Sequence, residues 1–167
     1  MKIATLIPTR TLREGVIATE KGTTEKNYIY EPGDIITGKN MVIDRRSYDS
    51  DYTEQSNVDG KVTFIKTKKM NAVTIKDLIE NIDEFNSNIS ESWIENSVIA
   101  KGIEFPGKVA TVNGDGKLVL VTSERVSEVP EDAVILFNTD NDGKYFNVYY
   151  CQVEKLPKLY ENASDIL

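Results

Sequence analysis

The 167-residue chain contains no histidine. It therefore lacks the side chain that most often serves as a general base and most often binds transition metals. No Gly-x-Ser-x-Gly or Ser-x-x-Lys motif occurs either, so the common arrangements that activate a nucleophile are missing. From these absences we expect a protein that is not an enzyme.

Cysteine and long apolar runs are also scarce. The single cysteine, Cys151, excludes an intrachain disulfide, and its β-type surroundings indicate a buried, inert thiol. The longest apolar runs, 118–121 and 133–137, are far shorter than the roughly 20 residues of a membrane-spanning helix. The apolar stretch at 2–7 is too short for a signal peptide. We therefore expect no membrane partner, and synthesis and function in a cytoplasm or in a particle assembled there.

Basic residues are fewer than acidic residues. Twenty basic side chains stand against 27 acidic ones, which gives a net charge of -7. A chain of this charge repels phosphate backbones, so we expect no nucleic-acid partner. The charge is uneven, because 61–71 holds four lysines and no acid whereas 74–104 holds two lysines and seven acids. Patches of this size also occur on solvated surfaces that bind nothing.

Turn signals and apolar spacing predict an α+β fold, mainly antiparallel β with a central helical insert at about 74–101. Asn113–Gly116 and Thr139–Gly143 are typical hairpin tips. Short strands are expected at 2–7, 28–30, 34–37, 41–44, 62–65, 108–112, 117–122, 133–138 and 144–153.

The helical insert is predicted from caps and periodicity. Thr74 followed by Asp77 resembles a capping box, and the apolar residues from Ile75 to Phe85 fall on one helix face. A second helical stretch is expected from Ser90 towards Ala100, ending near Gly102. Trp93 and Phe85 are expected to pack in the core, and a short helix is expected from about Lys158.

Two long polar stretches determine the expected organisation. Residues 1–27 are interpreted as an N-terminal strand followed by an arm-like segment, because Thr9–Asn27 shows little apolar pattern. Residues 28–167 are interpreted as a β-rich domain. The second polar stretch, Arg45–Asp59, is interpreted as a long loop.

The loop Arg45–Asp59 contains the candidate partner-binding residues. Arg45, Arg46, Tyr48 and Tyr52 lie close together, and arginine and tyrosine are enriched where proteins bury interfaces. We therefore interpret these four residues as a docking element.

Three motifs suggest ligands, but each has a better explanation. Gly33–Asn40 has the G-x-x-x-x-G-K spacing of a phosphate loop, but its interior is acidic and β-branched, so turns of a meander explain it better. Asn138, Asp140 and Asp142 mimic the start of a calcium loop, but Tyr149 stands where the bidentate glutamate belongs. Asp49, Asp51 and Glu54 are better explained as a charged, solvated loop. We expect no metal and no cofactor.

The arm-like Thr9–Asn27, the loop Arg45–Asp59 and a composition rich in Asn, Lys, Ile and Tyr give the chain a recognisable character. In this character it resembles the small auxiliary or decoration proteins of tailed-phage heads. The resemblance implies a non-enzymatic protein of the virion that binds capsid or other virion proteins in multiple copies, with residues 9–27 and 45–59 reaching neighbouring subunits.

Other functions stay open from the residues alone. A connector or tail-junction protein of the same virion would share this character. An enzyme or small-ligand module that uses carboxylates is a different class, and it predicts a concave, partly apolar pocket with acidic residues of raised pKa. A free regulatory protein that binds one host partner is a third alternative.

Overall fold

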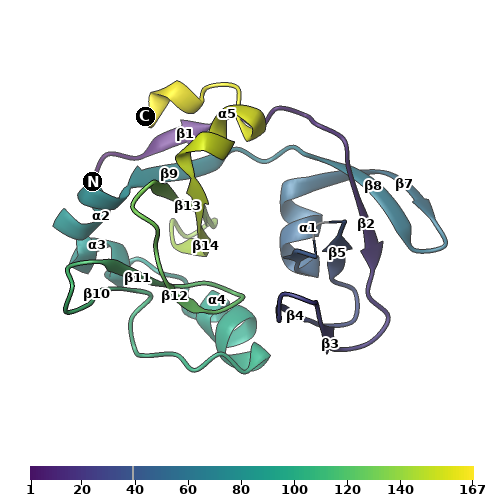
Figure 1. Ribbon diagram of the computed structural model, residues 1–167, viewed down its shortest axis with the longest axis horizontal. Coiled ribbons are helices and arrows are strands. Elements are labelled where there is room, and N and C mark those ends of the chain that lie inside the picture. Colours follow the sequence, from purple (N-terminus) through teal and green to yellow (C-terminus); the bar gives the residue numbers. More distant parts are fainter. Residues whose placement is uncertain (39) are drawn as a thin grey trace. The chain divides into compact units, whose positions relative to one another are not determined.

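The computed structural model describes residues 1–38 and 40–167 (Figure 1). Contacts divide the chain into two compact units. Unit 1 comprises Met1–Ile7 and Met70–Leu167, and unit 2 comprises Pro8–Lys69. The structure thus divides the chain elsewhere than at the expected residue 27. Its strands are antiparallel and helices are fewer, which confirms the predicted α+β class.

Unit 1 is built on a four-stranded antiparallel sheet of order β1-β9-β13-β14. In this sheet Leu6 lies opposite Met70, so the whole of unit 2 is inserted between two neighbouring strands. The strand β9 was not predicted. The bounds are β1 Ala4–Leu6, β9 Met70–Thr74, β13 Ala133–Thr139 and β14 Tyr145–Gln152.

Both faces of this sheet are covered, which explains the continuous apolar run in β13. Ile135 and Phe137 point into the larger core, which the helical insert covers. Val134 and Leu136 point into a smaller core with residues of the C-terminal segment. This segment contains α5 (Leu156–Leu159), so its helix starts earlier than expected, flanked by the short 3₁₀ turns Val153–Lys155 and Ala163–Asp165.

The helical insert is confirmed. Thr74 caps α2, its hydroxyl accepting a hydrogen bond from the Asp77 amide at 3.2 Å. The Asp77 carboxylate does not complete a capping box but accepts from the Lys2 amide at 2.6 Å. The insert ends at Gly102, whose φ of 85° suits glycine. Its parts are α2 Ile75–Glu80, α3 Ile82–Ser87, α4 Glu91–Trp93, a π-helical turn Ile94–Val98 and a 3₁₀ turn Ile99–Lys101.

A second sheet of unit 1, of order β10-β11-β12, contributes Ala110, Leu118 and Leu120 to the larger core. Its first hairpin turns at the predicted Asn113–Gly116, and the predicted hairpin at Thr139–Gly143 joins β13 to β14. The strand β12 was not predicted. The bounds are β10 Ala110–Val112, β11 Leu118–Val121 and β12 Val126–Glu128.

Unit 2 is a five-stranded antiparallel sheet of order β6-β5-β2-β8-β7, accompanied by one helix and a small hairpin. The bounds are β2 Arg13–Ile17, β3 Gly22–Thr23, β4 Ile29–Tyr30, β5 Ile35–Thr37, β6 Val42–Ile43, α1 Arg45–Asp51, β7 Tyr52–Val58 and β8 Lys61–Lys66.

The expectation of an arm at Thr9–Asn27 is wrong, because β2 is the central strand of this sheet and pairs with β5 and β8. A glycine inside β2 weakens the strand pattern in the sequence. It is needed because a Cβ on Gly15 would lie 2.6 Å from the Ile35 side chain.

The expectation of a loop at Arg45–Asp59 is also wrong. The segment forms α1 and β7, and β7 joins β8 through a two-residue turn. Both turn residues, Asp59 (φ 53°) and Gly60 (φ 85°), have the positive φ of a type I′ turn. The pair Asp59–Gly60 is therefore a hairpin signal inside the segment that was expected to be a loop.

Candidate functional site

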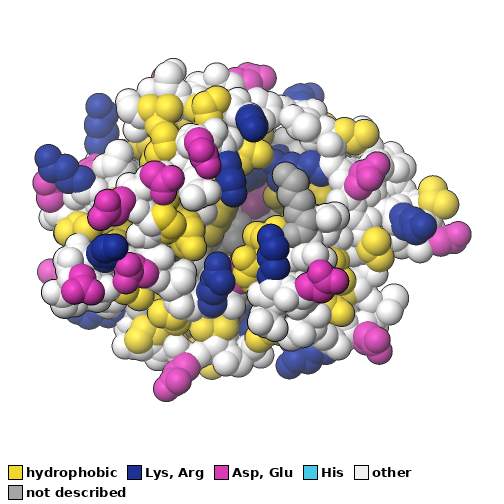
Figure 2. Space-filling view, viewed as in Figure 1, with side chains coloured by type: hydrophobic (Ala, Val, Ile, Leu, Met, Phe, Trp, Pro, Cys, Tyr) yellow, Lys and Arg dark blue, Asp and Glu magenta, His cyan; other side chains and the backbone are white. Residues whose placement is uncertain are grey.

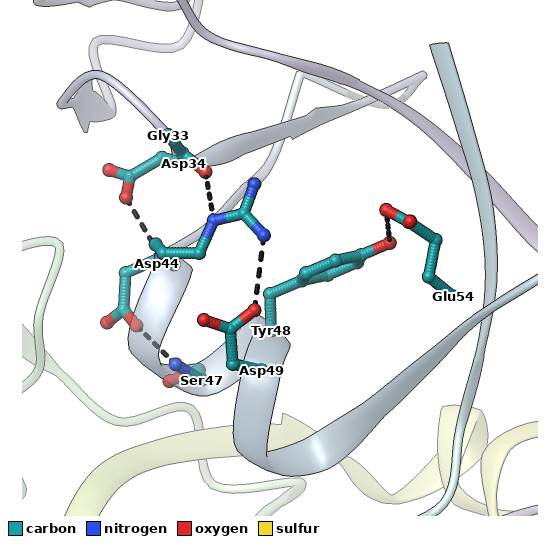
Figure 3. Close-up of polar contacts among 8 residues, drawn as sticks. Gly33, Asp34, Asp44, Ser47, Tyr48, Asp49 and Glu54 are labelled. Atoms are coloured by element: carbon teal, nitrogen blue, oxygen red, sulfur yellow. Dashed lines mark hydrogen bonds and ion pairs between the residues drawn. The ribbon is translucent and has the colours of Figure 1, made fainter. Parts of the chain in front are cut away.

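The four predicted docking residues lie on α1 and at the start of β7, in unit 2. The helix begins at Arg45 because two carboxylates accept from its first amides (Figure 3). Asp44 accepts from the Ser47 amide at 2.7 Å, and Asp34 accepts from the Arg45 amide at 2.9 Å. The second contact joins α1 to the turn before β5 and so fixes the helix on the sheet.

The guanidinium of Arg45 is used for internal contacts. Its Nε donates to the Gly33 carbonyl at 2.8 Å, and a terminal nitrogen donates to Asp49 at 3.1 Å. The same group lies 5.2 Å from the centre of the Tyr48 ring, within the range of a cation–π contact. Arg45 therefore fastens α1 to the Gly33 turn.

The two tyrosines form an aromatic cluster with Phe64 of β8. Phe64 meets the edges of Tyr48 and Tyr52 at centroid distances of 5.2 Å and 5.3 Å. Tyr48 is only 3% exposed and Phe64 is fully buried. Because the core cluster of unit 2 contains just four buried residues, these rings supply much of its apolar contact.

The Tyr48 hydroxyl donates to the Glu54 carboxylate at 3.0 Å, a contact drawn in Figure 3. Burial, with this hydrogen bond to a charged acceptor, raises the pKa of Tyr48 to about 12. Burial also raises the pKa of Tyr52, against the opposing effect of Arg13. The hydrogen bond from Tyr48 to Glu54 joins α1 to β7.

The structure therefore gives the predicted docking residues different roles. Tyr48 and Tyr52 pack between α1 and the hairpin β7–β8, Arg45 bonds α1 to the Gly33 turn, and Arg46 is exposed. The strand β7, against which the aromatic cluster packs, is exposed to solvent. Every side chain of 53–58 is exposed, and β7 ends the strand order of its sheet. We call the outer side of β7, which faces away from β8, the open edge.

The predicted acidic clusters are used for structure. Asp49 pairs with Arg45, buried Asp51 lies 3.7 Å from the Lys68 ammonium, and Glu54 accepts from Tyr48. The Asp140 carboxylate accepts from the amides of Asp142 and Lys144 and so closes its hairpin turn. Across 1–38 and 40–167 no group of three or more cysteine or acidic side chains is placed to hold a metal ion.

Of the phosphate-loop spacing Gly33–Asn40, Lys39 lies outside the described residues. Ile35–Thr37 forms β5, in agreement with the meander interpretation. Cys151 lies in β14, as predicted, but its side chain is half-buried rather than fully buried.

Phe105 lines two of the open hollows of unit 1. One, of about 340 Å³, is lined by apolar side chains that include Ile94 and Ile99. The other, of about 470 Å³, is lined by the charged residues Glu104, Glu124 and Arg125 together with apolar side chains. Burial raises the pKa of Glu124, although Arg125 and Lys101 act in the opposite direction. A single perturbed carboxyl beside an open, partly apolar hollow matches part of the pattern expected for a ligand module.

The surface shows no large area of one charge on the face drawn in Figure 2, where basic, acidic and hydrophobic side chains are interspersed. No helix among the described residues is both long and apolar enough to cross a bilayer. Comparison with family models, curated proteins and solved structures finds no match for this chain.

Proposed function

We propose that this chain is a non-enzymatic structural protein of a virus particle, an auxiliary or decoration protein that binds the capsid in multiple copies. The lack of catalytic motifs and the resemblance in character to phage-head auxiliary proteins support this proposal. The observation that carries it is the open edge of β7, a seven-residue strand at the end of a sheet with exposed side chains.

An open strand edge is a common means of protein association, because its free backbone groups accept a further strand. Here the edge is also held rigidly. Tyr48, Tyr52 and Phe64 pack behind it, and Glu54 is tied to Tyr48. A pre-ordered edge loses less conformational entropy on binding than a flexible arm does. Docking therefore depends on an ordered strand rather than on the arm expected at residues 9–27.

The test is gradient sedimentation of the protein from its native source, detected by mass spectrometry. Under the proposal the chain travels with a particle far heavier than its own 18.8 kDa. Recovery only at the top of the gradient contradicts the proposal. Copy number relative to the major capsid protein then separates a decoration protein, present in many copies, from a connector or tail-junction protein, present in a single ring.

A small-ligand module is the second candidate, and Glu124 beside Phe105 is the observation that favours it. This candidate predicts that a ligand from a screen shifts the melting temperature of the wild type and that Glu124→Gln abolishes the shift. Glu131 is exposed, so Glu131→Gln is the matched control and should keep the ligand-induced shift in melting temperature. A ligand shift that survives Glu124→Gln excludes this role for the carboxyl.

A further inference from the structure

Asparagine side chains close edges of the sheets in unit 1. The outer side of β1 is bonded to Asn162 in the C-terminal segment. The Ile7 amide donates to the Asn162 side-chain oxygen at 2.8 Å, and the Asn162 side-chain nitrogen donates to the Thr5 carbonyl at 2.8 Å. One amide thus takes the place of a neighbouring strand, satisfying both a donor and an acceptor of the edge.

The edge of β10 is closed by an asparagine side chain as well, and the start of β14 is bonded by backbone groups. Asn86 bonds in this way to Ala110 in β10. At the start of β14, the Tyr145 amide donates to the Asn88 carbonyl at 2.7 Å, and the Ser90 amide donates to the Tyr145 carbonyl at 2.8 Å. Where its outward backbone groups are bonded in this way, a strand does not accept a further strand, and covering an edge is one means by which proteins avoid unwanted association.

In the described residues no side chain from outside β7 bonds to its edge as Asn162 and Asn86 bond to theirs. The Gln55 side-chain nitrogen lies 3.4 Å from the Thr53 carbonyl within the strand. The Asp51 carbonyl accepts from the Thr67 amide at 2.8 Å, so Asp51 faces β8. Antiparallel alternation then turns the backbone groups of Glu54 outward. A bulge between Glu54 and Ser56 shifts the alternation by one residue, so Asn57 also faces outward. Within the described part of the chain, no other strand pairs with β7 on this side.

We infer that the open edge of β7 binds the open edge of β7 in a second copy of this chain. The two strands run antiparallel about a two-fold axis that passes through the bulge. Glu54 of one copy then lies opposite Asn57 of the other. The outward backbone amide and carbonyl of each residue can therefore bond to those of its opposite residue, on both sides of the bulge. The contact is isologous, and it joins two five-stranded sheets into one.

Features of β7 favour a second copy over an unrelated strand. In this register the opposed pairs are Glu54 with Asn57, Thr53 with Val58 and Gln55 with Ser56, so no two like charges face each other. A bulge also increases the local twist of a strand, which makes a flat, regular strand a poor neighbour. The second copy carries the same twist at the same place.

This inference rests on the proposed function and names a second copy of the chain as the partner at the open edge of β7, so contacts with the capsid would involve other surfaces of the dimer. The two can fail separately. A protein that dimerises through β7 but does not sediment with particles contradicts the proposed function alone. A protein that sediments with particles but is monomeric when purified contradicts this inference alone.

The experiment is sedimentation equilibrium of the purified full chain. Gln55 is exposed and flanks the proposed axis, so Gln55→Lys places two ammonium groups near each other and Gln55→Glu places two carboxylates there. We expect a wild-type dimer, a monomer for each variant alone, and a dimer when the two variants are mixed in equal amounts. Val16→Lys, at an exposed position on the central strand β2, should stay dimeric.

Amide exchange measured at low and high protein concentration locates the contact. The amides of Glu54 and Asn57 should exchange more slowly as the dimer forms, whereas Thr53 and Ser56, which face β8, should be protected at both concentrations. A wild type that is monomeric at every concentration overturns the inference. A dimer that both charged variants retain, or one without slowed exchange at Glu54 and Asn57, also overturns it.

Discussion

Asn86 and Ala110 exchange two hydrogen bonds. The Asn86 side-chain nitrogen donates to the Ala110 carbonyl at 2.8 Å, and the Ala110 amide donates to the Asn86 side-chain oxygen at 2.9 Å. The residue on α3 thereby fixes the helix to β10 and closes that strand's edge. Because Ala110 is only 1% exposed, its backbone groups have little access to water as a substitute.

Asn86→Ala should therefore destabilise unit 1 by about 1–3 kcal/mol, since it leaves a buried donor and a buried acceptor without partners. Denaturant unfolding followed by the fluorescence of Trp93, the single tryptophan, measures the change. Asn141→Ala, at an exposed hairpin tip, is the control and should lie within about 0.5 kcal/mol of the wild type. Equal effects at both positions would contradict the role assigned to Asn86.

Tyr48→Phe should cost about 1 kcal/mol at neutral pH, because the ring stays and only the hydrogen bond to Glu54 is lost. The pKa of Tyr48 is raised in the folded state, so the unfolded tyrosine ionises first. Its contribution is complete below pH 10 and is lost as the pH rises towards about 12. The free energy of unfolding, measured along this pH range, should decline less steeply for Tyr48→Phe than for the wild type.

Phe64→Ala should destabilise unit 2 by about 3–5 kcal/mol, because it removes a fully buried ring that contacts both tyrosines. Trp93 lies in unit 1 and reports only on that unit, whereas circular dichroism reports on both. We expect part of the unfolding transition seen by circular dichroism to move to lower denaturant concentration. The transition seen by Trp93 fluorescence should be unchanged. Ile65→Ala, at the next and half-buried position, should cost less. A Trp93 transition that shifts with Phe64→Ala would show that the units unfold together.

Replacing Pro8–Lys69 with a short glycine-containing turn should leave a folded unit 1, because Leu6 and Met70 already lie opposite each other in the sheet. The dispersed amide spectrum of the excised protein tests this outcome. As a control, deleting 1–69 also removes β1, whose buried Leu6 packs with Met70, and should leave that core incomplete. An unfolded excision variant would contradict the independence of unit 1.

The elements that the sequence predicts correctly are those with local causes. The hairpin tip at Asn113–Gly116 needs only the conformational freedom of its own residues, and the cap at Thr74 needs only the next turn of the helix. The run 133–137 was predicted as a strand because it is short and apolar. Its burial on both faces depends on segments on either side of it in sequence.

The elements that the sequence misses depend on distant partners. The helix α1 is fixed by Asp34 and Phe64, and β9 is defined by pairing with β1 and β13. The contact between Asn162 and Ile7 spans 155 positions of the chain. Three of the four residues predicted to dock a partner, Arg45, Tyr48 and Tyr52, contact other residues of unit 2. The exposed strand β7 lies in a segment that was expected to be a loop.

The asparagine closures also make unit 1 sensitive to ageing. Asparagine is among the residues lost at high temperature, and its deamidation replaces the side-chain nitrogen with an oxygen. At Asn162 this change would remove the donor to Thr5 and direct a carboxylate at that carbonyl. The Thr5 carbonyl on the edge of β1 would then lose its donor without any substitution in the gene. During storage, aggregation through unit 1 should therefore begin at a rate set by the deamidation of Asn162 rather than by the free energy of unfolding.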